Sequence, residues 1–407
     1  MTVSFQHATL DNGLTIIAET DPDAHSSAVG FFVRTGARDE DSPVMGVSHF
    51  LEHMMFKGTD KRSAEDINRG FDELGARNNA YTSSEITCFY AQIIPDKAPA
   101  CLELLADMMR PALRQADFDV EKGVILEEIA MYKDQPFWVL YERLAEEHYA
   151  GHPLGHRVLG TDETITDLTR DQMQAYFDDR YSADNTILAA AGNLDFDALV
   201  AEASTLCGPW QRTGTTRKHG NPGATGKRLE LTDDSVARGY LLAMAPGPAA
   251  DDPRRYAATL AAQLLGGPDN SRLHWALVET GLAEEAQAAF APSDKAGLFY
   301  LFAAADPDSI DRVRDTMLAE AESLVANVTD DDLARLRSRF ATSMTIGGER
   351  PYDRMQRIGR QWAYLGEHTP LEVELERINA VTLGDVAEVL EAFPIHVSPT
   401  LGTLKPA

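Results

Sequence analysis

The segment His49-Phe50-Leu51-Glu52-His53 constrains this chain more than any other stretch. Residues four apart on a helix lie one turn above each other on the same face, so the imidazoles of His49 and His53 can reach one metal ion. Glu52 is adjacent to His53, and its carboxylate can lie beside the metal without being a ligand. Two neutral imidazoles suit zinc, and a nearby carboxylate suits a general base acting on zinc-bound water. The motif therefore predicts a zinc site on a helix.

The surroundings of this motif favour a metal site over a coincidence. A helix with two surface histidines would show the same pattern by chance. Here the neighbouring side chains are apolar, and unpaired polar groups are costly to bury among them. The order H-x-x-E-H is also the inverse of the commoner zinc-binding order H-E-x-x-H. The apolar neighbours are Phe50, Leu51, Met54, Met55 and Phe56.

A second helix supplies carboxylates. Glu121, Val124, Ile125 and Glu128 fall at positions i, i+3, i+4 and i+7, which form one stripe of a helix. Two carboxylates on an otherwise apolar stripe are unusual unless something cationic lies against them. Glu127 points roughly 100° away from Glu128, so Glu128 is the better candidate for a third metal ligand. Taken alone, the stretch would be better explained as an exposed acidic helix.

Three histidines at intervals of four, His148, His152 and His156, suggest a second metal site only if one helix aligns them. Gly151 and Pro153 interrupt such a helix. We therefore expect a loop here and no second metal.

The charge of the chain bears on its partners. The 37 basic and 64 acidic residues give a net charge of −27. Such a field repels nucleic acid and anionic membranes and attracts cationic ligands such as basic peptides. Solubility alone explains the charge equally well. We expect no nucleic-acid partner and no membrane partner.

Cysteine usage and the N-terminus predict a cytoplasmic protein. The chain has 3 cysteines and no C-x-x-C spacing, so no disulfide framework is expected. The first residues have neither a basic region nor an apolar region of the kind that directs export. No stretch approaches the length of a membrane span.

Hydrophobic patterns predict alternating strands and helices in the first half. A turn of the Asp-Asn-Gly type indicates a hairpin, and Gly75 ends a helix that begins near residue 64. The expected strands are 8–20 (as a hairpin), 27–36, 79–94 (as a pair) and 184–195, and the expected helices are 64–74, 99–109 and 118–132.

The second half repeats this order of elements. Residues 208–228 are rich in Gly, Pro and Thr and contain no acidic residue, which is typical of a linker. At 407 residues the chain suits two domains of about 200. We predict α+β domains at 1–207 and 229–407 as a duplicated fold, with the metal in the first. The expected elements of the second half are strands at 235–244, 285–292 and 297–305, and helices near 253–266, near 271–280 and from 310.

On these residues the chain resembles the pitrilysin family of zinc peptidases, in the branch of roughly 400-residue chains similar to mitochondrial processing peptidase and its bacterial relatives. The likeness covers nearly the whole chain. The segments HFLEHMMFKGT, GARNNAYTSSE, EKGVILEEI and HPLGHRVLGT occur in the family's order and spacing. The resemblance implies two similar tandem α+β domains, each a mostly antiparallel sheet packed with helices.

The resemblance also assigns roles to residues. In the family the third zinc ligand is a glutamate about 75 residues beyond the second histidine, which is the place of Glu128. Glu121 would support the metal site without binding the metal. Asn79 and Ala80 would lie at a sheet edge, where an extended peptide adds as a strand. Read without the family, Asn78 and Asn79 are simply a turn before a strand.

The implied function is that of a zinc-dependent endopeptidase acting on unfolded peptides or precursor segments, with one zinc per chain and Glu52 as general base. A homodimer, or a heterodimer with a related chain, is expected by resemblance. One departure leaves the activity open. Val278 and Glu284 stand where the family often has an arginine and a tyrosine that reach the substrate. The alternatives are a zinc-bearing subunit that needs a partner chain and a non-catalytic subunit for peptide binding or assembly.

Overall fold

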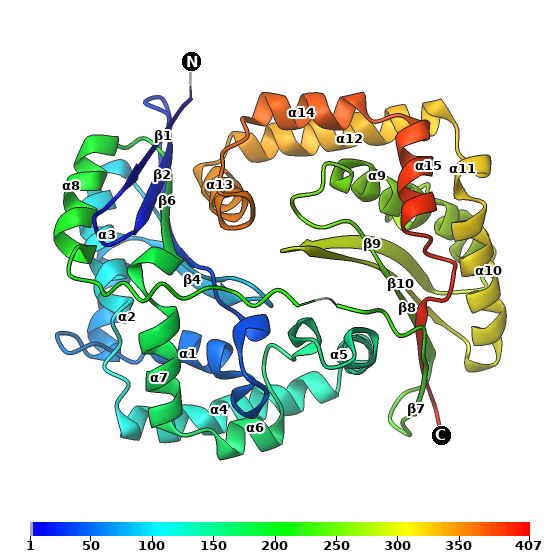
Figure 1. Ribbon diagram of the computed structural model, residues 1–407, viewed down its shortest axis with the longest axis horizontal. Coiled ribbons are helices and arrows are strands. Elements are labelled where there is room, and N and C mark those ends of the chain that lie inside the picture. Colours follow the sequence, from blue (N-terminus) through cyan, green and yellow to red (C-terminus); the bar gives the residue numbers. More distant parts are fainter. Residues whose placement is uncertain (1–2, 221) are drawn as a thin grey trace. The chain divides into compact units, whose positions relative to one another are not determined.

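The computed structural model describes residues 3–220 and 222–407. The chain divides into two compact units, each with one β-sheet and helices packed on it (Figure 1). This confirms the predicted α+β class with mostly antiparallel sheets. Unit 1 comprises Met1–Ala130, His156–Lys218 and Thr345–Thr369; unit 2 comprises Met131–Gly155, His219–Met344 and Pro370–Ala407.

The sheet of unit 1 has six strands in the order β1-β2-β6-β3-β5-β4. Neighbouring strands are antiparallel except for the parallel pair β2–β6. In the central strands Phe31 of β3 lies opposite Phe89 of β5 and Leu188 of β6. The predicted hairpin and strands of the first half are thereby confirmed. The strands are β1 (Ser4–Thr9), β2 (Thr15–Thr20), β3 (Ser27–Val33), β4 (Arg77–Thr82), β5 (Thr87–Ile93) and β6 (Thr186–Gly192).

Helices cover both faces of this sheet. The larger core lies on the face covered by α1, α3 and α8, where Phe50 stacks on Phe118 with ring centroids 4.7 Å apart. Helix α13 covers the other face through Met355 and Ile358. The helices of unit 1 are α1 (Val47–Met55), α2 (Ala64–Leu74), α3 (Ala98–Met108), α4 (Gln115–Lys133, which crosses the unit boundary), α6 (Asp162–Asp167), α7 (Arg170–Arg180), α8 (Phe196–Cys207) and α13 (Pro351–Leu365).

Unit 2 repeats this plan. Its five strands follow the order β7-β11-β8-β10-β9, with β7–β11 as the parallel pair, which matches β2-β6-β3-β5-β4 of unit 1. The strands are β7 (Arg228–Thr232), β8 (Gly239–Pro246), β9 (Glu285–Ser293), β10 (Ala296–Ala305) and β11 (Thr400–Lys405). The helices are α5 (Pro136–Tyr149), α9 (Arg255–Gly266), α10 (Ile310–Glu322), α11 (Leu324–Asn327), α12 (Asp330–Gly348, which crosses the unit boundary), α14 (Leu371–Ala380) and α15 (Leu383–Ala392).

The compact units differ from the predicted domains in two segments. Helix α5 precedes the linker in sequence but packs on β8 and β11 of unit 2. Helix α13 follows the linker but packs on β2, β3 and β6 of unit 1. A close approach at Gly359 accompanies the second contact, because a Cβ built there would lie 2.4 Å from Cζ of Phe32.

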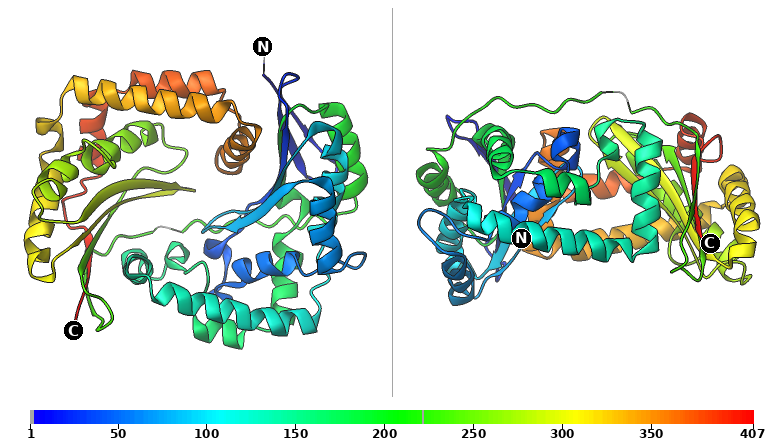
Figure 2. Two further views of the ribbon diagram at one scale, coloured as in Figure 1. Left: turned by 180° about the vertical axis from the view of Figure 1, so that it is seen from behind. Right: turned by 90° about the horizontal axis from the view of Figure 1, so that it is seen from below.

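The remaining segments are short or extended. Between α8 and β7, residues 211–227 contain no helix or strand where the structure describes them (Figure 2). Where a helix was predicted near 271–280, the structure has a π-helix at His274–Val278. Within the described residues, none of the helices has the length and apolarity that a bilayer crossing requires. The 3-10 helices are Ala37–Asp39, Ser42–Val44, Pro95–Lys97, Pro153–Gly155, Ala183–Asn185 and Pro307–Ser309.

Candidate metal centre

Helix α1 carries the H-x-x-E-H motif into the core of unit 1. Its apolar side chains Phe50, Leu51, Met54 and Met55 are fully or almost fully buried and anchor the helix. His49 is 8 % exposed, whereas His53 is more open. The anchoring face therefore fixes the helix, and the two histidines one turn apart share a different face.

The structure brings the three predicted ligands together. The Nε2 atoms of His49 and His53 lie 3.8 Å and 3.6 Å from Oε2 of Glu128. One possible ligand atom from each residue falls within a set whose members are all within 4.8 Å of one another. A tetrahedral zinc ion about 2.0–2.1 Å from each ligand would place them roughly 3.4 Å apart. The donor set, two imidazoles and one carboxylate, and its spacing both fit zinc.

Glu121 orients one of these ligands. The Nδ1 of His53 donates a hydrogen bond of 2.8 Å to Oε1 of Glu121, which leaves Nε2 free to face Glu128. The other carboxylate oxygen of Glu121 lies 2.5 Å from Nζ of Lys57. Glu121 is 3 % exposed, so these two contacts balance a charge that water does not reach. Lys57, which lies in the turn just after α1 and four residues beyond His53, was missed in the sequence.

Glu52 lies beside the ligands and is held by a different element. Oγ1 of Thr82, the last residue of β4, donates a hydrogen bond of 2.5 Å to Oε2 of Glu52. Burial raises the pKa of the Glu52 carboxyl, while the bond from Thr82 and the nearby His53 lower it and Glu128 raises it. A raised pKa strengthens a carboxylate as a proton acceptor. Sequence reasoning missed Thr82, because nothing in the sequence shows that β4 ends at the motif helix.

The charge state of His49 follows from its surroundings. Burial, and next the neighbouring His53, lower the pKa of His49 to about 3. The imidazole is therefore neutral near pH 7 and keeps a lone pair for a metal ion. Its buried Nδ1 has no hydrogen-bond partner among the described residues.

Asn79 and Ala80 lie in β4, which is an edge strand of the described sheet. The Ala80 amide donates to the side-chain oxygen of Asn79 at 2.9 Å, and the strand ends at Thr82 beside Glu52. This edge thus runs toward the metal ligands. Peptide binding along it remains a prediction.

The histidines of the segment 148–156, and Val278 and Glu284, are not among the candidate metal ligands. The helix α5 extends to Tyr149, so the expected loop begins only there. Nδ1 of His148 bonds to Oγ1 of Thr400 at 2.9 Å. In the described residues one group of possible metal ligands is found, and it is the set on α1 and α4. Glu284 pairs with Arg238 at 2.7 Å, and Val278 ends the π-helix of unit 2.

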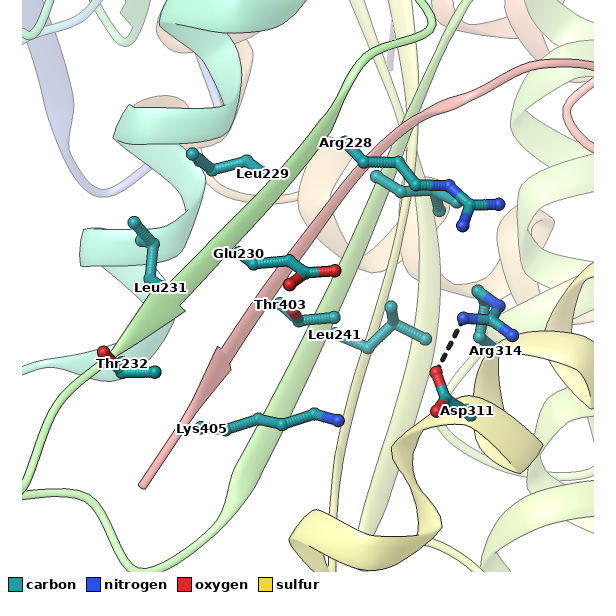
Figure 3. A pocket seen from close by; sticks show the side chains of 11 residues that line it. Arg228, Leu229, Glu230, Leu231, Thr232, Leu241, Asp311, Arg314, Thr403 and Lys405 are labelled. Atoms are coloured by element: carbon teal, nitrogen blue, oxygen red, sulfur yellow. Dashed lines mark hydrogen bonds and ion pairs between the residues drawn. The ribbon is translucent and has the colours of Figure 1, made fainter. Parts of the chain in front are cut away.

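A pocket of about 180 Å³ lies in unit 2 between α10 and the strands β7, β11 and β8. Figure 3 shows Arg228, Glu230 and Lys405 pointing from the sheet toward α10. There Arg314 is already paired with Asp311 at 2.7 Å, and also with Asp315 at 2.8 Å. The pocket contains no predicted site residue, and its lining mixes basic, acidic and apolar side chains.

Comparison with known proteins identifies the family. The profile described as "Insulinase (Peptidase family M16)" matches residues 15–162, and the one described as "Peptidase M16 inactive domain" matches residues 167–340. A Mycobacterium tuberculosis protein called an uncharacterized zinc protease is 33% identical over 94% of this chain and 89% of its own length. The chain belongs to peptidase family M16. The resemblance seen in the sequence is thereby confirmed.

Other proteins are similar to this chain over almost its whole length. A Streptomyces coelicolor protein, also called an uncharacterized zinc protease, is 32% identical over 94% of this chain and 86% of its own length. A crystal structure of a protease from Helicobacter pylori superposes with a TM-score of 0.93 at 20% identity, covering 100% of both chains. The region matched by the M16 peptidase profile, residues 15–162, contains all candidate metal residues, whereas Val278 and Glu284 lie in the region matched by the inactive-domain profile.

Proposed function

We propose that this protein is a zinc endopeptidase that binds one zinc ion per chain and hydrolyses unfolded peptides or precursor segments. The observation that carries the proposal is the convergence of His49, His53 and Glu128 beside a carboxylate, Glu52, that is not needed as a ligand. A purely structural zinc site gains nothing from such a carboxylate. Zinc, when bound, supplies Lewis acidity toward a water molecule and the substrate carbonyl.

Side chains of this protein would transfer the proton and hold the candidate zinc ligands in place. Glu52 accepts a proton from the attacking water and delivers it to the leaving amine. Thr82 holds the Glu52 carboxylate in place through its hydroxyl. Glu121 holds His53 in the tautomer that offers Nε2, and Lys57 balances the charge of Glu121.

The edge strand β4 supports a mode of peptide binding. An extended peptide that pairs with the backbone at Asn79 and Ala80 gains affinity with little demand on its sequence. The same strand leads to Thr82, so a paired peptide would be directed toward Glu52. The net charge of −27 favours basic peptides.

A second candidate function is a zinc-bearing subunit that needs a partner chain. It is favoured by Val278 and Glu284, which cannot supply the arginine and tyrosine common in the family. A heterodimer with a related chain would provide such a partner, whereas a homodimer, the other expected assembly, would not, because both of its copies carry Val278 and Glu284. A non-catalytic subunit for peptide binding or assembly is disfavoured by the intact Glu52. The expected cytoplasmic location of this protein remains a prediction.

The test is cleavage of a basic, unstructured peptide by the purified chain with zinc, beside a Glu52→Gln variant and a zinc-chelated sample. Cleavage by the wild type, with neither control active, supports an endopeptidase that needs no partner. If the wild type binds zinc but does not cut, the second candidate function replaces the first. Equal cleavage by wild type and Glu52→Gln would point to a contaminating peptidase and contradict the role of Glu52.

A further inference from the structure

The N-terminus of α1 lacks a cap of its own. Gly46 precedes the helix in the left-handed region at φ 94°, and no side chain at this position bonds back to the first turn. The first backbone N–H groups of a helix have no partner within it and need one from elsewhere. Val47 and Ser48 are fully buried, so water does not serve them.

Glu40 supplies the missing acceptors from outside the helix. Its Oε2 accepts a hydrogen bond of 2.7 Å from the Gly46 amide, and its Oε1 accepts one of 2.7 Å from the Ser48 amide. Glu40 is 3 % exposed. Burial raises the pKa of this carboxyl to about 8, and the two amide donors oppose that rise. A carboxyl placed at a helix N-terminus also suits the positive end of the helix dipole.

The segment that carries Glu40 is also hydrogen-bonded to the residues that follow β4. The amides of Ala37 and Arg38 donate to the carbonyls of Ser83 and Ser84. These two residues directly follow Thr82, whose hydroxyl bonds to Glu52. One connected set of contacts therefore joins the start of α1 to the end of β4.

Nearby contacts reinforce this segment. Asp39, next to Glu40, forms a two-pronged ion pair with Arg217 at 2.9 Å and 2.8 Å. The Ser48 hydroxyl shares a hydrogen bond of 2.7 Å with Tyr176 of α7. The phenol of Tyr176 shares another of 2.7 Å with Thr35.

We propose that Glu40 is a positioning residue of the metal centre: by holding the Gly46 and Ser48 amides, it sets the direction of the short helix α1 and thereby the separation of His49 and His53 from Glu128. Helix α1 has 9 residues, so the position of its first turn decides where ligands in its first and second turns point. Glu40 touches neither metal nor substrate. The proposal rests on the zinc site of the proposed function but not on hydrolysis.

The test measures zinc affinity by competition with a chromophoric chelator in wild type, Glu40→Gln and Tyr176→Phe. The side-chain amide of glutamine has one oxygen to accept a hydrogen bond, where the carboxyl group of Glu40 has two that each accept a backbone amide. We therefore expect zinc affinity to fall roughly 10-fold, the lower end of losses seen when groups behind metal ligands are removed. Tyr176→Phe removes buried hydrogen bonds near α1 but leaves its capping intact, and is expected to retain wild-type affinity.

Three further readouts separate positioning from stability. Unfolding of the zinc-free proteins in denaturant gives the loss of stability alone. Glu40→Asp, which keeps the carboxyl group but is one methylene shorter, is expected to bind zinc more tightly than Glu40→Gln. In a peptide assay Glu40→Gln should lower kcat and leave KM unchanged. Wild-type zinc affinity in Glu40→Gln, or an equal loss in Tyr176→Phe, overturns the proposal.

One measurement needs no variant. In zinc-free wild type, amide hydrogen exchange at Gly46 and Ser48 should be slow, because Glu40 holds these groups whether or not metal is bound. Rapid exchange at both amides overturns the proposal. If zinc affinity responds to Glu40 while no peptide is cut by the wild type, the positioning role stands and the peptidase proposal fails.

Discussion

The hydroxyl of Thr82 lies 2.5 Å from Oε2 of Glu52, and this hydrogen bond joins the end of strand β4 to the motif helix α1. The two residues are 30 apart in sequence. The edge strand expected to receive a peptide thus ends at the carboxylate expected to act on water. In the proposed function, this one side-chain contact would couple peptide placement to proton transfer.

Removing this contact should impair turnover more than binding. In Thr82→Val the carboxylate of Glu52 loses its donor, and hydrogen bonds to charged groups are worth about 1.5–3 kcal/mol. We expect kcat to fall at least about 10-fold, with zinc content unchanged. Steady-state kinetics and metal analysis check this. Thr82→Ser, which keeps the hydroxyl, is the matched control and should retain most activity. A Val variant as active as the Ser variant would exclude a role for the bond.

Glu121 should control zinc affinity without binding zinc. In Glu121→Gln the His53 imidazole faces a neutral acceptor, and Lys57 loses its ion-pair partner. We expect zinc affinity to fall by about 10- to 100-fold, as for other groups that orient metal-bound histidines. Competition with a chelator measures this.

The same helix α4 offers a control for that change. Glu127 is exposed and points roughly 100° away from Glu128. Glu127→Gln removes the same charge and should leave zinc affinity within about twofold of wild type. Similar losses in both variants would mean that overall charge, not the contact with His53, governs binding.

Local pattern was enough to predict most elements and to bring two candidate metal ligands together. The helix 64–74 follows from its apolar spacing and Gly75, and the structure has α2 over the same residues. His49 and His53 share one helix, so their spacing alone places them together. Glu128 was reached through its stripe on a second helix, which the resemblance to the family then supported.

What the sequence could not show depends on contacts between distant segments. An amphipathic pattern shows that α13 has a face to bury, but not that the face meets the sheet of unit 1. Thr82 is 30 residues from Glu52, and no local pattern predicts that the two meet. Glu40 is only 8 residues from Ser48, but the chain between them has no regular helical or strand spacing that would predict their contact. Lys57 is different, because its position four residues after His53 was a usable signal.

The packing of α13 makes a prediction about stability. A Cβ at Gly359 would lie 2.4 Å from Cζ of the buried Phe32 ring, which cannot move aside without disturbing the core. Gly359→Ala should therefore lower the free energy of unfolding by about 1–3 kcal/mol, the usual cost of overpacking. Denaturant unfolding followed by circular dichroism measures this.

The matched control is a helical glycine at which an added Cβ would make no close contact. A Cβ at Gly347 of α12 would have no heavy atom nearer than Cβ of Asp353 at 3.9 Å. Gly347→Ala should leave stability unchanged or raise it by up to about 1 kcal/mol, because alanine favours a helix. Equal stability of the two variants would contradict the close approach of α13 to Phe32.

His148 should make the stability of the fold depend on pH. It is 2 % exposed at the end of α5, and burial lowers its pKa from 6.5 to about 4. Above pH 6.5 the imidazole is neutral in both the folded and unfolded states, so its contribution is fully present. As the pH falls from 6.5 toward 4, His148 becomes protonated in the unfolded chain but stays neutral in the folded protein, so stability is lost.

The size and test of this effect follow from the two pKa values. Between pH 7.5 and 5 the wild type should lose about 2 kcal/mol of unfolding free energy through His148. In His148→Gln this loss should vanish, because glutamine does not titrate. Denaturant unfolding of zinc-free wild type and variant at both pH values isolates the difference, since His49 and the other titrating groups are common to both proteins. The same pH dependence in both would show that His148 is not buried as a neutral base.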